Sequence, residues 1–316
     1  MSKINRPYIG VEIGATKLQV ALGTAQGGVV EMLRETAHAE SGAHAILDQV
    51  VRMVRRLCVG HDVAAVGVGF GGPVDEAGGR AITSHQVVGW DDIPLVRHLE
   101  EACGHPCVLD NDANCAALAE AIAGAGKGFD ATFYTNIGSG IGGGLVIQGS
   151  VYAGRLGSME IGHTWVDSKL EGHPGRLEDL CSGWAIARRA RKMSGGGASD
   201  QSLDNPALGT LDAEETARRW LSGDPAATRL MEDVIDSFAQ ALCNVIALLN
   251  PPVIVVGGGV ALIGSPLISG LTASVRRQLL FKPFAENFTI MPAHYGEDAV
   301  PVGALLLAAR DGFKTP

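Results

Sequence analysis

Blocks of apolar residues alternate with polar stretches along the chain in a way that is typical of an α/β protein. Residues 8–14 and 17–22 read as two strands joined by a short Gly-Ala-Thr turn, and residues 29–33 suggest a third strand. Residues 43–58 place apolar side chains at helical spacing, with basic residues on the other face, which predicts an amphipathic helix. Residues 64–74 indicate a buried strand that enters a glycine turn.

Further elements follow with shorter patterns. Residues 94–103 look helical, residues 106–110 form a short apolar strand, and residues 113–123 predict a helix that ends at Gly124. Residues 194–210 are rich in Gly, Ser and Asp and are the most loop-like part of the chain. The later predicted elements are strands at 133–138 and 142–147 around a glycine turn, a polar stretch to about residue 178, a helix at 225–249, a buried strand at 252–256 and a helix at 300–310.

Two parts of the chain are similar to each other. Residues 11–16 line up with residues 135–140, because each has a strand, a polar residue, an apolar residue and a glycine turn before the next strand. This repeat suggests a duplicated α/β unit with two glycine turns. We therefore expect a two-domain α/β fold with a ligand cleft between the domains. The expected domains are residues 1–112 together with 301–316, and residues 113–300.

Glycine is the outlier in the composition. The chain of 316 residues holds 43 glycines, about twice the ordinary share of roughly 7%. With 46% hydrophobic and 19% charged residues, the chain has the composition of a folded globular protein, and not that of a collagen repeat or a flexible linker. We infer that the glycines lie where a side chain cannot be tolerated.

The charge balance argues against a general nucleic-acid-binding protein. The chain has 25 Lys and Arg against 34 Asp and Glu, a formal net charge of −9, whereas such proteins need a basic face. Backbone N–H groups can still hold a phosphate. The six cysteines form no CxxC pair, which is typical of reduced thiols. The N-terminus lacks the apolar stretch of a signal peptide. Residues 237–275 carry no charge, but prolines and glycines break this stretch into pieces too short for a transmembrane helix. We expect a cytoplasmic protein that does not span a membrane.

Two stretches match the GxGxxG pattern of dinucleotide-binding proteins, but neither has its context. That fingerprint opens a helix, whereas the match at 67–72 enters Pro73-Val74-Asp75 and the match at 138–143 enters an apolar strand. The chain also lacks a GxxxxGK[ST] P-loop. Residues 138–144 hold five glycines, a density that lets backbone amides approach an anion closely. A tight hairpin between two strands is the alternative interpretation of the same residues.

Several motifs occur in order along almost the whole chain. They are IGVEIGATK at 9–17, GGPV at 71–74, GWD at 89–91, DNDAN at 110–114, NIGSGIGGG at 136–144, EIGH at 160–163 and VGGGVA at 256–261. In this order and spacing they resemble the motifs of the ROK family (repressor, open reading frame, kinase). The resemblance implies a two-domain, actin-like fold with a duplicated ribonuclease H-like unit, which the family shares with hexokinases and Hsp70.

The resemblance also implies a role for each motif. Asp112 resembles the general base that accepts the proton of a sugar hydroxyl as the hydroxyl attacks the γ-phosphate of ATP. From the residue type alone, Asp112 is better explained as the N-cap of the helix that follows it, and the two roles can coexist. The residues implied to bind the sugar are Gly72, Asn111, Asp112, Glu160, His163 and Glu178. Those implied to bind ATP, with Mg²⁺, are Glu12, Gly14, Ala15, Thr16, Lys17, Gly138, Ser139 and Gly140 for the phosphates and Gly257, Gly258 and Gly259 for the adenosine.

Three positions depart from the family pattern. Many members carry a CxCGxxGCxE zinc loop after the ExGH motif, but residues 169–178 here read KLEGHPGRLE, so no structural Zn²⁺ is expected and His163 is left for the sugar. An ion pair between Arg176 and Glu171 is our hypothesis for what replaces part of the metal's role. Glu12 stands where the family usually has Asp, so the resemblance does not fix how active the enzyme is. Gln86, beside His85, stands where the family usually has Asn, which affects the preferred sugar.

The implied function is an ATP-dependent sugar kinase that phosphorylates the terminal primary hydroxyl of a hexose, and glucose is the first candidate substrate. The alternative substrates are N-acetylmannosamine, N-acetylglucosamine and fructose. Polyphosphate is an alternative phosphate donor, but the sequence shows no basic groove that would bind such a polyanion. A sugar-binding sensor with weak catalysis is the alternative of another class. A transcriptional repressor is disfavoured, because the first strand begins near Tyr8 and leaves no room for a DNA-binding domain before it. By analogy with the family, we expect a homodimer or homotetramer.

Overall fold

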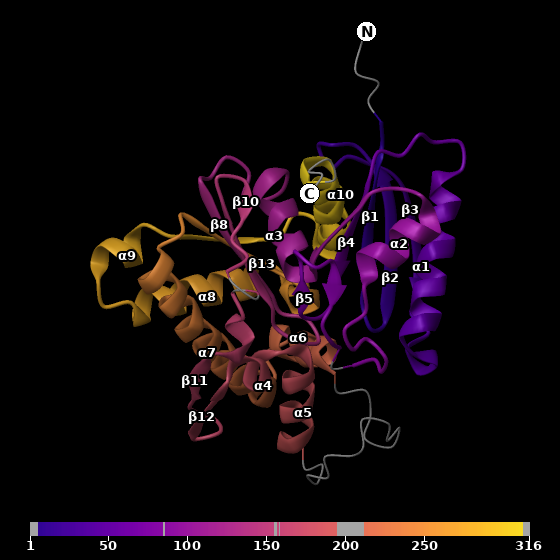
Figure 1. The fold of residues 1–316 in the computed structure, drawn as a ribbon. Coiled ribbons are helices and arrows are strands. Elements are labelled where there is room, and N and C mark those ends of the chain that lie inside the picture. Colours follow the sequence, from indigo (N-terminus) through magenta and orange to yellow (C-terminus); the bar gives the residue numbers. More distant parts are fainter. Residues whose placement is uncertain (1–5, 85, 155–156, 158, 195–211, 312–316) are drawn as a thin grey trace. The chain divides into compact units, whose positions relative to one another are not determined.

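The structure is a computed structural model that describes residues 6–84, 86–154, 157, 159–194 and 212–311. The chain folds into two compact units, which are described separately (Figure 1). None of the helices in the described ranges combines the length and the apolar character that crossing a bilayer needs. The first unit comprises residues 1–131, 144–158 and 297–316, and the second comprises residues 132–143 and 159–296.

These units have different bounds from the domains expected from the sequence. The expected division falls after Asp112, whereas the structure keeps helix α3 (Asp112–Ile122) in the first unit. The physical reason is the packing of α3 against α10 (Ala299–Asp311). A Cβ atom added to Gly303 would lie only 1.7 Å from the carbonyl oxygen of Cys115, so the two helices meet backbone to backbone.

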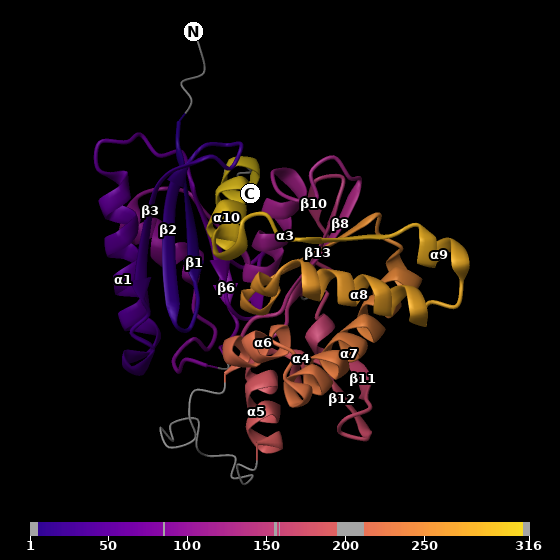
Figure 2. The ribbon, with the colours of Figure 1, turned by 180° about the vertical axis from the view of Figure 1, so that it is seen from behind.

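The first unit is built on a five-stranded mixed sheet in the order β3-β2-β1-β4-β7. The three strands β1, β2 and β3 are antiparallel neighbours, whereas β1, β4 and β7 run parallel. Helices α1 and α10 cover opposite faces of this sheet (Figure 2). Because both faces are covered, β4 is buried along its whole length and reads as the continuous apolar run VGVGF.

The hydrophobic core of the first unit follows from the helix pattern seen in the sequence. The apolar stripe of α1, which includes Ile46, Val50 and Val54, is fully buried against the sheet, and Arg55 and Arg56 face outwards at the last turn. The elements of this unit are β1 (Tyr8–Ile13), β2 (Lys17–Gly23), β3 (Val29–Thr36), η1 (Ala39–Ser41), α1 (Gly42–Cys58), β4 (Val66–Phe70), β5 (Val74–Asp75), β6 (Arg80–Ala81), α2 (Leu95–Cys103), β7 (Cys107–Asn111), α3, the hairpin of β9 (Gly143–Ile147) with β10 (Ser150–Val151), η5 (Gly296–Asp298) and α10.

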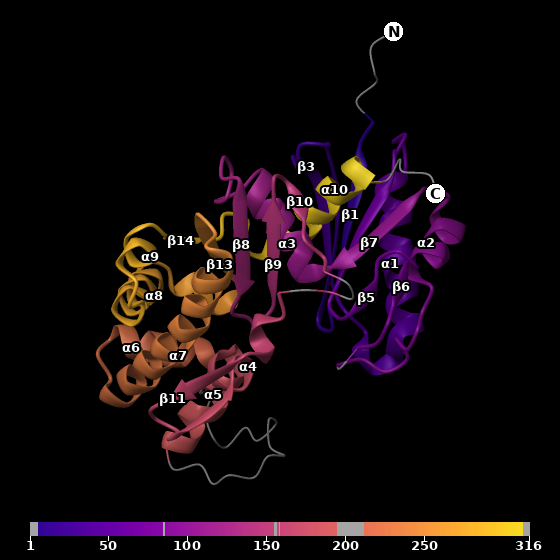
Figure 3. The same cartoon turned by 60° about the vertical axis from the view of Figure 1, so that its left-hand side comes forward.

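The second unit is built around parallel strands and one long helix. Strand β13 (Val253–Gly257) pairs with β8 (Ala131–Asn136) on one side and with β14 (Thr289–Pro292) on the other. Helix α7 (Pro225–Leu249) has α8 and β11 alongside it (Figure 3). The remaining elements are η2 (Ile161–His163), β11 (Trp165–Ser168), β12 (His173–Arg176), α4 (Leu177–Cys181), α5 (Gly183–Met193), α6 (Ala213–Leu221), η4 (Gly259–Ile263), α8 (Ser265–Gln278) and α9 (Lys282–Glu286).

The structure confirms the regular elements that the apolar pattern predicts. The helix expected at 225–249 has these bounds, and the helices expected at 43–58 and 300–310 each begin one residue earlier. The stretch expected to be polar up to residue 178 instead contains the β11–β12 hairpin. The pattern also missed α5, α6, α8 and β14. Of the loop expected at 194–210, all but Ser194 lies outside the described residues.

Candidate functional site

One edge of the first unit's sheet gathers three of the predicted motifs. In the parallel ladder, Ile13 at the end of β1 pairs with Phe70 at the end of β4, and Phe70 pairs with Asn111 at the end of β7. The residues that follow these strands therefore leave the sheet side by side. A Cβ atom added to Gly71 would lie 3.4 Å from Oδ2 of Asp112 and 3.7 Å from Cα of Gly14. The carboxyl ends of parallel strands are the usual place for a ligand site in such sheets.

Asn111 anchors this edge with both ends of its amide. Its Oδ1 accepts hydrogen bonds from the backbone N of Ala113 at 2.9 Å and of Asn114 at 3.4 Å, which makes Asn111 the N-cap of α3. Its Nδ2 donates to the carbonyl oxygen of Gly72 at 3.1 Å. The alternative in which Asp112 is the N-cap is therefore wrong. Asp112 is the first residue of the helix itself, half-buried, with one carboxylate oxygen toward Gly71.

The turn after β1 presents backbone amides. Gly14 donates to the carbonyl oxygen of Lys17 at 3.1 Å and closes the turn. A side chain at Gly14 would bring its Cβ to 3.0 Å from that oxygen. Within the described part of the chain, the N–H groups of Ala15 and Thr16 have no hydrogen-bond acceptor. Two such amides on a tight turn are suited to bind an anion.

Glu12 lies at this edge in a network that the sequence did not reveal. Its Oε2 accepts a hydrogen bond from Nε2 of Gln19 at 2.6 Å and lies 3.7 Å from Nζ of Lys17. Gln19 is fully buried, accepts from Nε of Arg34 at 2.7 Å and donates to the carbonyl oxygen of Glu297 at 2.7 Å. Burial raises the pKa of Glu12, and the charge of Lys17 opposes this effect. The alternation of β2 puts Lys17 and Gln19 on the same face of the strand, which was the available signal.

A second carboxyl, Asp110, lies buried one residue before the Asn111 cap. Its Oδ1 accepts from Nδ2 of Asn114 at 2.8 Å and from the backbone N of Asn111 at 2.6 Å. Burial raises the pKa of Asp110 to about 7; the bond from Asn114 opposes the rise, and the nearby Glu76 carboxyl adds to it. The folded state therefore holds a proton on Asp110 that the unfolded chain releases near its ordinary pKa of about 4.

This raised pKa predicts how stability depends on pH. Because the folded state binds more protons than the unfolded state between about pH 4 and pH 7, Asp110 lowers the free energy of unfolding as the pH rises through this window. The variant Asp110→Asn keeps an oxygen acceptor for Asn111 and Asn114 but cannot ionise. We expect it to gain stability relative to the wild type at pH 8 and not at pH 5, measured by urea unfolding. An equal difference at both pH values would contradict the prediction.

In the second unit, residues 138–142 form a compact glycine turn after β8. Asn136 accepts from the backbone N of Gly142 at 3.0 Å, and Gly138 donates to the carbonyl oxygen of Gly140 at 2.9 Å. The backbone N of Ile141 donates to Oε2 of Glu178 at 2.8 Å. Among the described residues, no acceptor faces the N–H groups of Ser139 and Gly140. The turn is therefore a hairpin link and also presents two amides that can receive a phosphate.

The glycine triplet after β13 adjoins this turn. Gly257 pairs with Asn136 in the β8–β13 ladder, and Ile137 donates to the carbonyl oxygen of Gly257 at 2.8 Å. Gly258 has a φ of +84° and could not carry a Cβ, which would lie 2.6 Å from the backbone of Ile137. At Gly259 a Cβ would meet nothing within 4 Å. Packing thus explains the first two glycines, and the third leaves open space beside the turn.

The predicted sugar-side residues of this unit lie on two segments that meet. Glu160 and His163, both exposed, flank η2, and the backbone N of His163 donates to the carbonyl oxygen of Glu160 at 3.1 Å. Glu178 lies in the first turn of α4. The backbone N of Leu177 donates to the carbonyl oxygen of Thr164 at 2.8 Å, so the neighbours of His163 and Glu178 are bonded to each other. Glu178 is also the residue that holds Ile141 of the glycine turn.

The segment between these residues does not suit a structural zinc ion. The β11–β12 hairpin carries Lys169, Glu171 and Arg176 where the zinc loop has cysteines, and the described residues contain no cluster of three or more His, Cys, Asp or Glu arranged for a metal. The expected ion pair between Arg176 and Glu171 is wrong. Arg176 pairs with Asp179 at 2.8 Å, because both lie at the start of α4, and Glu171 pairs instead with residues of α5.

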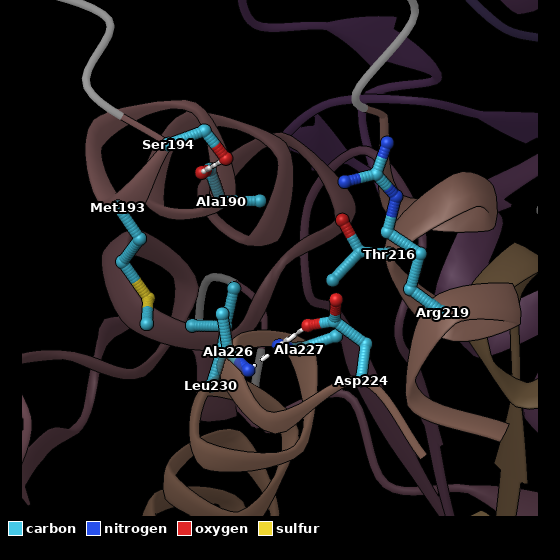
Figure 4. A pocket seen from close by; sticks show the side chains of 9 residues that line it. All are labelled: Ala190, Met193, Ser194, Thr216, Arg219, Asp224, Ala226, Ala227 and Leu230. Atoms are coloured by element: carbon cyan, nitrogen blue, oxygen red, sulfur yellow. Dashed lines mark hydrogen bonds between the residues drawn. The ribbon is translucent and has the colours of Figure 1, made fainter. Parts of the chain in front are cut away.

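A small cavity lies elsewhere, between α5, α6 and α7 (Figure 4). Its volume of about 30 Å³ holds one or two water molecules and no larger ligand. Of its polar side chains, Asp224 accepts from the backbone N of Ala226 and of Ala227 as the N-cap of α7, and Ser194 donates to Ala190. These groups stabilise helix ends, and we assign no ligand to this cavity.

Comparison with known proteins gives a consistent family. The model of the ROK family matches residues 8–311. A glucokinase of Thermotoga maritima is 29% identical over 94% of this chain and 95% of its own length. An N-acetylmannosamine kinase of Escherichia coli O9:H4 is 30% identical over 95% of this chain and 97% of its own length. The crystal structure of a ROK family glucokinase from Streptomyces griseus, in complex with glucose and AMPPNP, superposes with a TM-score of 0.80 at 28% identity and covers 95% of this chain and 98% of that one.

Proposed function

Because the chain belongs to the ROK family, whose actin-like fold it has, we propose that it is an ATP-dependent kinase for the terminal primary hydroxyl of a hexose, with glucose as the substrate. The observation that carries the proposal is the sheet edge of the first unit, where the Asp112 carboxylate lies beside Gly71 and the Gly14 turn. The glucokinase relatives in the comparison support the choice of glucose.

In this proposal, Asp112 accepts the proton of the sugar's primary hydroxyl while that oxygen attacks the γ-phosphorus of ATP. A new O–P bond forms to the sugar, the bond between the γ-phosphorus and the bridging oxygen breaks, and ADP leaves with the bond's electron pair. Asp112 suits this role because it is half-buried at the strand ends, and its Oδ2 lies toward Gly71 while its Oδ1 accepts from the backbone N of Ala113 at 2.7 Å. The other residues of the site contribute by positioning the two substrates and by neutralising the charge of the phosphates.

The phosphate ligands we propose are backbone amides on two turns. Ala15 and Thr16 supply the amides of one turn, which Gly14 closes, and Ser139 and Gly140 supply those of the other, which Gly138 closes. Backbone donors of this kind would let a chain with net charge −9 bind a triphosphate. Lys17 adds a cation. The open space at Gly259, after Gly257 and Gly258, suits the adenosine.

Mg²⁺ fits the donor set at the first turn, because Glu12 is a half-buried carboxylate with oxygen ligands of the kind that Mg²⁺ prefers. When bound, Mg²⁺ would offset negative charge on the ATP phosphates. The protein's part is to hold the Glu12 carboxylate in place through Gln19 and Lys17.

The proposed sugar ligands are Gly72, Asn111, Glu160, His163 and Glu178. Hydrogen bonds at both ends of its amide fix the orientation of Asn111, and Glu178 is held by the bond that it accepts from Ile141. The relative that is an N-acetylmannosamine kinase keeps that amino sugar as the second candidate substrate. Assembly as a homodimer or homotetramer and a cytoplasmic location stay predictions.

The test is release of ADP from Mg-ATP with glucose, N-acetylmannosamine, N-acetylglucosamine and fructose, and a parallel assay with polyphosphate as the donor. We expect the highest kcat/KM with glucose and ATP. A preference for N-acetylmannosamine would keep the kinase and change its substrate. Absence of turnover on every sugar, with sugar binding intact by calorimetry, would replace the kinase by the sugar-binding sensor.

A further inference from the structure

The second unit contains a deeply buried ion pair between two helices. Arg189 of α5 and Asp233 of α7 have side chains that are only 3% and 5% exposed, and Nη2 of Arg189 donates a hydrogen bond to Oδ2 of Asp233. Two charges are costly to bury unless other hydrogen bonds satisfy them, so the partners of this pair are informative. Nη1 of Arg189 donates to the carbonyl oxygen of Leu180 at 2.8 Å.

The other partners of this pair all come from the tip of the β11–β12 hairpin. Ser168 donates from its hydroxyl to Oδ2 of Asp233 at 2.7 Å, and the backbone N of Leu170 donates to Oδ1 of Asp233 at 3.0 Å. Nε of Arg189 lies 3.2 Å from Oε1 of Glu171. The hairpin tip is therefore fixed to α5 and α7 by charged and polar contacts, at the place where the zinc loop of other members would supply metal ligands.

The same face of α7 also holds the strand that leads to the tip. Gln240 accepts from the backbone N of Asp167 at 2.9 Å and donates to the carbonyl oxygen of Asp167 at 3.0 Å, so its amide pairs with β11 as a neighbouring strand would. The hydroxyl of Ser237 donates to the same carbonyl oxygen at 2.8 Å. Asp233, Ser237 and Gln240 follow one another at helical spacing, which places all three on one side of α7.

The base of the hairpin carries the residues that we assign to the sugar. His163 precedes Thr164, Glu178 follows Leu177, and the bond between Thr164 and Leu177 closes the base. Because the two strands of the hairpin are paired along their length, a displacement of the tip also displaces the base. Glu178 in turn holds the backbone of Ile141 in the glycine turn.

We propose that Asp233 and Arg189 are positioning residues that fix the hairpin, and through it His163 and Glu178, for binding of the sugar. The inference rests on the proposed function for the identity of the ligand. Neither residue touches the sugar. Asp233 orders the tip by accepting from Ser168 and Leu170, and Arg189 joins Asp233 to Glu171, so a cluster of protein charges does the ordering without a metal ion.

The test compares Asp233→Asn and Glu171→Gln with a matched control, Glu215→Gln. The control removes an ion-paired carboxylate of the same unit, on α6, whose ion pairs among the described residues are with Arg218 and Arg219 of its own helix. We expect the KM for glucose to rise about tenfold or more in both hairpin variants, because displacement of binding groups by about 1 Å is costly. The KM for ATP should change less than twofold, and the control should behave as the wild type.

A merely structural role would give another result. If the variants only lower the melting temperature, and the glucose KM well below that temperature equals that of the wild type, the proposal is overturned. Should Asp233→Asn fail to fold, Glu171→Gln carries the test, because Glu171 is partly exposed at the surface. Stoichiometric zinc in the purified wild-type protein, or loss of glucose affinity with a chelator, would also overturn the proposal.

A separate measurement distinguishes this inference from the proposed function. Trp165, one of the four tryptophans of the chain, lies in β11 with its side chain exposed, so the fluorescence of the protein includes a signal from the hairpin. If the wild type binds glucose without phosphorylating it, the proposed kinase fails, and the fluorescence-derived Kd for glucose still tests the inference. A Kd unchanged in Asp233→Asn and Glu171→Gln would overturn it.

Discussion

Replacement of Asp112 by asparagine is expected to lower kcat for phosphoryl transfer by about 10²- to 10⁴-fold, the usual contribution of a general base. The amide keeps the size and one oxygen of the carboxylate but cannot accept the proton of the sugar hydroxyl. The glucose KM should change much less, because Gly72, Asn111 and the residues of the second unit remain. A loss in kcat without a matching loss in binding is the signature of a group that acts in the transition state.

The substitution should also leave the fold intact. Replacement of an N-cap residue by alanine costs about 0.5–2 kcal/mol of stability, but asparagine is as good a cap as aspartate. Since Asn111 caps α3, Asp112→Asn should keep the unfolding midpoint of the wild type. Asp62→Asn is the matched control, because Asp62 is exposed and pairs with Arg6, beyond the other ends of β1 and β4. Wild-type turnover in Asp112→Asn would remove Asp112 from the mechanism.

The sequence predicted most of the first unit because its elements have strong, single-period patterns. The apolar runs of β1 and β4 and the stripe of α1 each admit one interpretation, and the glycine turns mark where the strands end. The motifs contain Gly14, Gly71 and Asp112, and the strand register of the structure brings these residues to one edge of the sheet. The local sequence pattern was therefore sufficient for elements whose ends are marked by their own residues.

The predictions failed where the partner of a side chain lies far away in the chain. Glu171 has Arg176 five residues away, but the structure pairs it with Arg189 at 3.2 Å, because α5 folds back beside the hairpin. In the same way, Gln19 reaches Glu297 across 278 residues. The Asn111 cap was missed for a local reason. Asn and Asp are both good caps, and the sequence does not show whether the helix begins at residue 112 or at residue 113.

The sequence predicts that the 43 glycines lie where a side chain cannot be tolerated, and in the first unit several of them lie where a helix packs against backbone. A Cβ on Gly10 of β1 would lie 2.1 Å from the carbonyl oxygen of Pro301, and one on Gly67 of β4 would lie 1.9 Å from that of Ala304. With Gly303 facing α3, helix α10 touches backbone on both sides. Sequence alone cannot distinguish these glycines from those of a ligand site, because the helix they meet is more than 200 residues later.

Gly303→Ala is therefore expected to destabilise the protein by about 3 kcal/mol or more, at the upper end of the range for an overpacked core. In an exposed helix, the same change would instead add up to about 1 kcal/mol of stability, because alanine is the better helix former. Here the added methyl group would lie 1.7 Å from the backbone oxygen of Cys115, and neither α10 nor α3 can yield without moving the sheet or the Asn111 cap. Urea unfolding measures the effect.

The control and a second variant separate packing from helix propensity. Gly270→Ala changes a glycine of α8 whose added Cβ would lie nearest to the Cδ1 methyl of Ile235, at 3.0 Å, and this end of the side chain can rotate away. We expect its stability to stay within about 1 kcal/mol of the wild type. Gly67→Ala approaches α10 from the sheet and should be as damaging as Gly303→Ala. If Gly303→Ala and Gly67→Ala unfold like Gly270→Ala, α10 does not contact the backbone of its neighbours, and the close packing of α3, α10 and the sheet is incorrect.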